Sequence, residues 1–267
     1  MTADCVTLWV GDALGPVERA CLKSMLRQGH SVALYAYGKP RGVPAGVELR
    51  DAADVLPETA IVRHRSGSVA LFSDLFRYEL QRRGLGTWID TDMYLVGRLD
   101  MERPYLFGKQ VVTRSRPWRP RQRQSINGSV LRMPPDSPML PPLLAQFARA
   151  DIPEWVPWQR AVWAKARTWM TGRPDLSSLP WGTAGPFAVS ALAERYGFAS
   201  QALPADVFNP VPWYDAAWIV DPRVKLENVV TRRTIGIHLW NECIKALKDE
   251  PAPEGSFLAR LQREGRE

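Results

Sequence analysis

The sequence predicts an α/β fold in which a mostly parallel central sheet is covered by helices. Residues 5–10 (CVTLWV) form a short apolar, β-branched run that ends at a glycine, and residues 31–37 (SVALYAY) form a second one. Between these runs, residues 16–27 carry apolar side chains at helical spacing. Buried parallel strands are continuous apolar runs, and two parallel strands need a crossover between them. We therefore expect this strand–helix–strand unit to begin a doubly wound sheet.

The rest of the chain continues this alternation, with a helical insertion in its second half. We expect, in order, a loop leading to a short edge element (38–56), a helix (68–83), a strand (87–90), an irregular arginine-rich loop (113–125), a strand (126–131), a helical insertion (about 139–171), a helix (185–196), a proline-rich loop (202–222) and a charged terminal helix or tail (251–267). The predicted buried faces of the two helices at 68–83 and 185–196 are Leu71, Phe72, Leu75, Phe76 and Leu80, and Phe187, Val189, Leu192 and Tyr196.

Length and composition limit the class of protein. The 267 residues, of which 45% are hydrophobic and 24% charged, indicate one globular α/β domain. The formal net charge of +7 favours an anionic partner such as a nucleotide, an acidic glycan, a lipid surface or a nucleic acid. The three cysteines fit neither a disulfide framework nor a zinc site. Without a recognisable signal peptide or a long apolar span, we expect a cytoplasmic protein.

Two aspartates follow the predicted strand at 87–90. Asp90 and Asp92 are separated by one residue, so along an extended chain their side chains point the same way. Two like charges at the end of an apolar strand are costly unless a cation lies beside them. The usual cation is Mg²⁺ or Mn²⁺, held through oxygen and shared with substrate phosphates. The alternative is that both residues belong to a solvated turn.

The residues around these aspartates resemble a known pattern. The stretch SDLFRYELQRRGLGTWIDTDMYLV resembles the sugar-binding region of glycosyltransferase family 32 and its relatives, where a helix with (Ala/Ser)-Asp-x-x-Arg precedes a glycine pair, an aromatic residue and Asp-x-Asp. The matching residues are Ser73, Asp74, Arg77, Gly86, Asp90 and Asp92. The sequence departs from the pattern at Leu85, where a glycine is usual, and at Trp88, where a tyrosine is usual.

Four further stretches resemble the same family in the same order. They are LWVGDALGPVERACLKS (8–24), INGSVL (126–131), WGTAGP (181–186) and HLWN (238–241). The resemblance therefore extends over most of the chain, from about residue 8 to about residue 241. It implies the GT-A architecture, a Rossmann-like fold, with a nucleotide-binding half (1–100) and an acceptor half (101–245).

The resemblance implies a retaining glycosyltransferase that uses Mn²⁺ or Mg²⁺. The expected donor is a nucleotide sugar, UDP-hexose, and the expected acceptor is a glycan or glycolipid that receives an α-linkage. Asp90, Asp92 and His238 would hold the metal, although a lone histidine such as His238 is more often a satisfied core residue. The stretch WGTAGP offers no second carboxylate as a nucleophile, which favours attack by the acceptor on the face that the leaving group vacates.

Further residues would bind the donor. Trp9 would stack on the base, with core packing as its alternative, and Trp88 would reshape the donor pocket. Asp74 and Arg77 would hold the transferred sugar, with a surface ion pair as their alternative. Asn127, which we place at the start of a strand, could hydrogen-bond that sugar as donor and acceptor. Trp240 and Asn241 would reach the diphosphate.

The acceptor region is less well defined by the sequence. Residues 113–125 pack five arginines around a tryptophan, and the stretch is either a solvated loop, a clamp for an anionic acceptor or a contact with acidic lipids. A contact with acidic lipids would place the protein peripherally at the inner face of the membrane. Candidate acceptor residues are Arg119, Arg121, Trp181 and Thr183. Nucleic acid is not expected as a partner, because we find no module that binds it.

One predicted helix within the insertion carries several tryptophans. Trp158, Val162, Ala166 and Trp169 fall on one helical face. Such a face is more often part of a core than of a site. If the face is exposed, it would suit a glycan that stacks on aromatic rings, or a membrane surface.

Three other functions are compatible with the same residues. The chain could be a glycosyltransferase that modifies proteins, like toxins and effectors with similar donor motifs. It could bind a nucleotide sugar without turnover, although Asp90, Asp92 and His238 argue against this. It could also be a basic nucleic-acid-binding protein, which would show tight binding that depends on salt.

Overall fold

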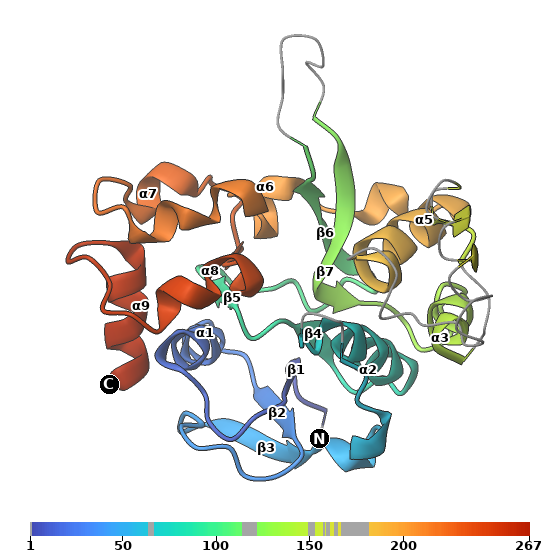
Figure 1. Ribbon diagram of the computed structural model, residues 1–267, viewed down its shortest axis with the longest axis horizontal. Helices are drawn as coiled ribbons and strands as arrows, with labels where there is room; N and C mark the ends of the chain where they lie inside the picture. The colour runs from blue at the N-terminus through green and yellow to red at the C-terminus, as the bar shows by residue number, and fades with distance from the viewer. Residues whose placement is uncertain are drawn as a thin grey trace.

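A six-stranded sheet forms the centre of the computed structural model, which describes residues 2–63, 67–113, 122–148, 153–156, 158, 161–162, 165–166 and 182–267 (Figure 1). In spatial order its strands are β3 (Val47–Asp51), β2 (Val32–Ala36), β1 (Cys5–Trp9), β4 (Thr87–Ile89), β7 (Gln124–Arg132) and β6 (Leu106–Val111). The first four are parallel, and β7 runs antiparallel to both of its neighbours. The predicted mostly parallel sheet is confirmed, including the edge element between residues 38 and 56.

A second, two-stranded sheet joins distant parts of the chain. Strand β5 (Met93–Leu95) pairs antiparallel with β8 (Gly236–His238), and the register places Met93 opposite His238. Since β5 begins directly after Asp92, this pairing brings the carboxyl-terminal histidine next to the two aspartates.

Helices cover both faces of the central sheet. The α-helices are α1 (Pro16–Arg27), α2 (Ala70–Arg82), α3 (Leu140–Ala148), α5 (Ala188–Arg195), α6 (Ala205–Phe208), α7 (Leu226–Val229), α8 (Asn241–Lys248) and α9 (Phe257–Arg266). Shorter or tighter helical segments are η1 (Ala52–Asp54), η2 (Glu58–Ala60), η4 (Thr183–Phe187), η5 (Ala199–Gln201) and η6 (Trp213–Val220). Helices α2, α3 and α5 pack on one face and α1 on the other, with α9 outside α1 (Figure 1).

Alternation along the strands explains why both faces are apolar. In β1, Val6 packs in the cluster formed with α2, α3 and α5, whereas Cys5 packs in the cluster formed with α1. In β2, Tyr35 packs in the cluster with α2, α3 and α5, and Leu34 packs in the cluster with α1. Each fully buried side chain of this size stabilises the fold by roughly 1.5–3 kcal/mol, so a sheet buried on both faces needs the continuous apolar runs seen in the sequence.

Two glycines form the connection between α2 and β4. Gly84, with φ 63°, directly follows the carboxyl-terminal turn of α2. A Cβ on Gly86 would lie 2.5 Å from the carbonyl oxygen of Ala3, and the φ of Gly86 is 133°. The chain can therefore turn from α2 into β4 only with glycine at this second position.

The terminal helix is part of the fold. A Cβ on Gly265 of α9 would lie 1.9 Å from the carbonyl oxygen of Pro16, so the two backbones touch. Of the two predicted alternatives for this region, a charged helix or a tail, the structure has the helix α9. No helix among the described residues is long and apolar enough to cross a membrane.

Several details differ from the sequence predictions. Leu71 and Leu75 are only half-buried, and Tyr196 is 39% exposed because it follows the last turn of α5. Helix α5 begins at Ala188, after the irregular segment η4, and not at residue 185. The region 202–222 is not a plain loop, since it contains α6 and η6. Strand β7 already begins at Gln124, so the end of the predicted arginine-rich loop is regular strand and Asn127 lies inside that strand.

The three cysteines have different surroundings. Cys5 and Cys21 are fully buried, and this burial raises the pKa of both thiols. Cys243 is exposed on α8. None of the three is in a disulfide.

Candidate metal centre

A tight turn after β4 presents the two aspartates. The backbone N–H of Asp90 donates to the carbonyl of Ser129 at 2.8 Å, which fixes Asp90 against β7. The N–H of Met93 then donates to the carbonyl of Asp90 at 3.0 Å and closes the turn. Because β4 and β1 are parallel neighbours, the turn lies at the edge of the sheet where their carboxyl ends meet, the usual ligand edge of such sheets.

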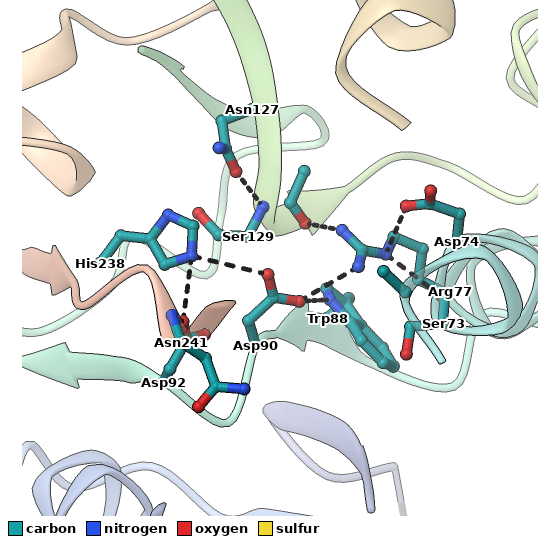
Figure 2. A network of polar contacts seen from close by, with 12 residues as sticks. Ser73, Asp74, Arg77, Trp88, Asp90, Asp92, Asn127, Ser129, His238 and Asn241 are labelled. Carbon is teal, nitrogen blue, oxygen red and sulfur yellow. Dashed lines mark hydrogen bonds and ion pairs between the residues drawn. The ribbon is translucent and has the colours of Figure 1, made fainter. Parts of the chain in front are cut away.

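His238 completes a cluster with the two aspartates (Figure 2). Its Nε2 lies 3.4 Å from Oδ2 of Asp92 and 4.0 Å from Oδ2 of Asp90. One ligand atom from each residue lies within 4.8 Å of the other two, and Asp92 and His238 are buried. This Asp-Asp-His cluster could hold a metal ion, since carboxylate oxygen and imidazole nitrogen are both ligands of divalent cations.

The electrostatics of the cluster fit a cation. Burial raises the pKa of Asp90, and the charge of Asp92 adds to the rise. Burial also acts to raise the pKa of Asp92, but the charge and hydrogen bond of His238, together with the N–H of Asn241, lower it below its usual value. Burial acts to lower the pKa of His238, but the negative charge of Asp92 outweighs burial and raises this pKa above its usual value. A divalent cation would favour ionisation of both carboxylates at once, which their mutual repulsion opposes.

Arg77 holds Asp90 from the side of α2. Its guanidinium lies 3.2 Å from Oδ1 of Asp90, donates to the carbonyl of Gly128 at 2.7 Å and lies 4.9 Å from the ring centre of Trp88. The indole N–H of Trp88 donates to the same Oδ1 at 2.6 Å. Arg77 is 7% exposed and Trp88 2% exposed, so the interpretation of Arg77 as part of a surface ion pair is wrong. Both residues fix the orientation of Asp90.

Asp74 is a second carboxylate on the same side. Its Oδ1 lies 3.5 Å from Nε of Arg77, and its side chain is 13% exposed. Burial raises the pKa of Asp74 to about 6, against the attraction of Arg77. A Cβ on Gly185 would lie 2.9 Å from both carboxylate oxygens, so the segment after Gly182 packs directly on Asp74.

Asn127 is buried in a polar row on the β6–β7 hairpin. Its Nδ2 donates to Oε1 of Gln110 at 2.6 Å. Its Oδ1 accepts from the N–H of Ser129 at 2.6 Å (Figure 2). Asn127 thus braces the strand that receives the N–H of Asp90. Its predicted contact with a sugar remains a prediction.

Helix α8 approaches Asp92 from the other side. The N–H of Asn241, its first residue, donates to Oδ2 of Asp92 at 2.7 Å. The side-chain oxygen of Asn241 accepts from Nζ of Lys248 at 2.6 Å, and Nζ also binds the buried carboxylate of Glu18 on α1. Trp240 has φ 59° and ψ 60°, a left-handed conformation that is unusual for a residue other than glycine. Its indole N–H donates to the carbonyl of Val211 at 2.8 Å.

Trp9 lies at the carboxyl end of β1. It is half-buried and packs against the apolar cluster under α1, and its indole nitrogen is buried without a hydrogen-bond partner among the described residues. The core-packing interpretation therefore has direct support, and the stacking interpretation stays a prediction.

The predicted acceptor residues are only partly described. Arg119, Arg121 and Trp181 lie outside the described residues. Thr183 is buried, and its carbonyl accepts from the indole N–H of Trp155 at 2.9 Å.

The tryptophan-bearing helical face differs from its expected core location. Trp158 is 72% exposed and Val162 57% exposed, and Ala166 is exposed as well. Trp169 lies outside the described residues. For the described residues of this face, the core interpretation is wrong.

Two supporting residues escaped the sequence predictions. Asn209 faces Nδ1 of His238 at 3.1 Å, and Lys248 faces Asn241. Neither stands in a pattern that marks a site, since Asn209 lies in a proline-rich stretch and Lys248 in an ordinary charged helix.

Comparison with protein-family models and with curated proteins finds no match to this chain.

Proposed function

We propose that this chain is a metal-dependent retaining glycosyltransferase that moves a hexose from a nucleotide sugar, UDP-linked, to a saccharide or lipid-linked glycan acceptor. The observation that carries the proposal is the convergence of four of the five stretches that resemble glycosyltransferase family 32. Residues that are far apart in the sequence meet within one polar network (Figure 2). The contacts that join the stretches are Arg77 with Gly128, Asp74 with Gly185, and His238 with Asp92.

This convergence was not required by the local patterns. The stretch at 238–241 and the stretch at 73–92 could each have belonged to a separate surface, and the pairing of β5 with β8 brings them together. The first stretch contributes β1, whose carboxyl end lies beside that of β4. A GT-A-like arrangement, with the nucleotide at this edge and the acceptor on the side of the β6–β7 hairpin, accounts for the whole set.

The residues fit the metal that the resemblance implies. Asp90, Asp92 and His238 would hold Mn²⁺ or Mg²⁺, and the mixed oxygen and nitrogen set favours Mn²⁺ of the two. When bound, such an ion supplies positive charge to the diphosphate leaving group.

The protein groups around the cluster are already oriented. Arg77 and Trp88 fix one oxygen of Asp90 and leave the other directed toward His238. From the side of α8, the N–H of Asn241 holds Oδ2 of Asp92, the same oxygen that faces His238. Preorganised ligands of this kind lose little conformational freedom when the donor binds.

Retention is implied by the resemblance, and the segment after Gly182 bears on the route to it. Residues 183–185 are small and buried, and residues 183–186 bring no carboxylate to the site. Same-face attack by the acceptor is therefore favoured over a covalent glycosyl-enzyme. Trapping such an adduct by mass spectrometry would contradict this part of the proposal.

A panel of donors tests the proposal. UDP-glucose, UDP-galactose, UDP-N-acetylglucosamine and GDP-mannose are each added with and without Mn²⁺, and the melting temperature and slow donor hydrolysis are measured. At a donor concentration of 100 Kd we expect one donor to raise the melting temperature by about 5–10 °C only when Mn²⁺ is present. The Asp92→Ala variant should lose both the shift and the hydrolysis.

The matched control is Asp100→Ala, since Asp100 is an exposed aspartate in a surface ion pair with Arg103. It should respond to the donor as the wild type does. No response of the wild type to any donor would refute the proposal. Metal-dependent binding without hydrolysis or transfer would indicate a non-catalytic binder, and transfer to peptides alone would indicate a protein-modifying enzyme.

A further inference from the structure

We infer that Asn209 is a positioning residue that sets the tautomer of His238, so that Nε2 is the nitrogen offered to a cation. The inference rests on the proposed metal-dependent function. Asn209 follows α6, is 2% exposed, and reaches His238 from the side opposite to the aspartates. Its Oδ1 lies 3.1 Å from Nδ1 of His238.

The orientation of the Asn209 amide is fixed by a second contact. Its Nδ2 donates to the backbone carbonyl of Lys109 at 2.9 Å. A carbonyl oxygen only accepts hydrogen bonds, so the amide nitrogen must face Lys109 and the amide oxygen must face His238.

The orientation of the amide determines the tautomer of the histidine. The amide oxygen can only accept, so Nδ1 of His238 must carry its hydrogen. Nε2 is the atom that faces Asp92 and Asp90. With Nδ1 already protonated, Nε2 either carries a second hydrogen, which makes the ring a cation beside Asp92, or offers its free electron pair to a metal ion that takes the place of this hydrogen. Residues that hold a histidine ligand in this way raise metal affinity about 10–100-fold.

The support for Asn209 comes from the central sheet. Lys109 lies in β6 and its N–H donates to the carbonyl of Leu203 at 2.9 Å, so its carbonyl cannot turn freely. The N–H of Ile235 donates to the carbonyl of Val207 at 2.9 Å, which ties the strand carrying His238 to α6. Asn209 thus connects the strand β6 to the candidate metal ligand.

A purely structural role for Asn209 would be to bind Lys109 and hold α6 on the sheet. Two substitutions separate the roles. Asn209→Leu removes both the donor and the acceptor. Asn209→Asp removes the donor to Lys109 but keeps an oxygen acceptor for Nδ1 of His238. A tautomer role predicts that the Asp variant keeps its metal affinity, and a structural role predicts that it loses as much as the Leu variant.

The first measurement is a titration of each metal-free protein with Mn²⁺, by calorimetry and by the electron paramagnetic resonance signal of free Mn²⁺. We expect Asn209→Leu to bind Mn²⁺ about 10–100-fold more weakly than the wild type. We expect Asn209→Asp to remain within about threefold, as in carboxylate–histidine–metal sites. The matched control is Asn228→Leu on α7, an exposed asparagine that caps its own helix, and it should bind as the wild type does.

The second measurement identifies the protonated ring nitrogen of His238 when Mg²⁺, which is diamagnetic, is bound at the cluster. Two-bond ¹⁵N–¹H correlation spectra at a pH where the ring is neutral distinguish the ring nitrogens, and the chain has only 3 histidines, which makes assignment with His238→Gln direct. The wild type should show hydrogen on Nδ1, and Asn209→Leu should show hydrogen on Nε2 as well. Hydrogen on Nε2 alone in the wild type would overturn the inference, as would unchanged Mn²⁺ affinity in a folded Asn209→Leu.

These outcomes can be told apart from failure of the proposed function. If the wild type binds Mn²⁺ and turns over a donor but carries hydrogen on Nε2, only the role of Asn209 is wrong. If the wild type binds no Mn²⁺, the proposed function fails, whatever the tautomer. Should Asn209→Leu not fold, Asn209→Asp and the wild-type spectrum still decide the question.

Discussion

The two sides of the candidate site use similar residues for different ends. On the side of α2, Arg77 satisfies Asp90 and two backbone carbonyls, so a buried cation of the protein itself neutralises the acidic groups. On the side of β8 and α8, the carboxylate of Asp92 and the imidazole of His238 lie at the spacing of a metal-binding cluster. The first side is complete as a piece of protein structure, whereas the second is arranged for a ligand. Substitutions on the α2 side should therefore change mainly the stability of the fold, and substitutions on the side of β8 and α8 should change mainly ligand binding.

Replacing Arg77 should have the largest effect on stability. Arg77→Met leaves the buried carboxylates of Asp74 and Asp90 without their cation, which typically costs about 3–5 kcal/mol. The free energy of unfolding from urea titration measures this. The matched control is Arg82→Met, whose surface pair with Glu79 should contribute at most about 1 kcal/mol. Similar losses in both variants would show that the α2 side is not a buried network.

Replacing Asp74 should stabilise the protein, by an amount that depends on pH. The pKa of Asp74 is raised from 3.8 to about 6 in the folded state. Between pH 3.8 and about 6 the folded state therefore binds more protons than the unfolded state, and the free energy of unfolding falls as the pH rises. Below pH 3.8 this cost is absent, and above about 6 it is complete, at roughly 3 kcal/mol.

The Asp74→Asn variant tests this sign. Its unfolding free energy should exceed that of the wild type at pH 7, and the difference should shrink as pH falls to 4. The melting temperatures of both proteins across this range measure the difference. A difference that grows on acidification would mean that Asp74 is stabilised as a carboxylate, contrary to its burial.

Adding one methyl group at Gly185 should have an intermediate effect. The new Cβ would lie 2.9 Å from both oxygens of Asp74, and a change of this kind typically costs about 1–3 kcal/mol. Combining Gly185→Ala with Asp74→Ala should remove the part of the loss that this contact causes. If it does not, the two residues do not press on each other as the structure has them.

Asp92→Asn should have the smallest effect on stability. The amide oxygen still accepts from the N–H of Asn241, and the relief of the repulsion with Asp90 offsets the lost attraction to His238, so we expect a change within about 1 kcal/mol. The stabilisation that Mn²⁺ gives the wild type should be lost in the same variant. If Asp92→Asn unfolds as readily as Arg77→Met, the contrast between the two sides is wrong.

The amino-terminal elements were predictable because their signals are local. Helix α1 matches its predicted range, with Pro16 at its first turn, and β1 and β2 follow from continuous apolar runs. In contrast, α6 and η6 are short segments that no local period marks. Their conformation depends on distant parts of the chain, since α6 packs on β6 and β8, and η6 packs on α8 and α9.

The site divides in the same way. Asp90 and Asp92 stand in a recognisable local pattern, and the sequence places them at a strand end. His238 needed the resemblance, because a lone histidine after a short strand is usually structural. Asn209 could not be found, because its contact with His238 depends on how α6 and β8 pack against each other. A residue that acts through another has no motif of its own.

The exposed thiol of Cys243 has a practical consequence. Cys5 and Cys21 are sealed in the core, so a maleimide dye will react with one position of the native protein without prior mutagenesis. That position lies in the first turn of the helix that begins at Asn241, whose N–H binds Asp92. The fluorescence of such a conjugate would follow events at the aspartates in real time, and it could be used to screen compound libraries in solution.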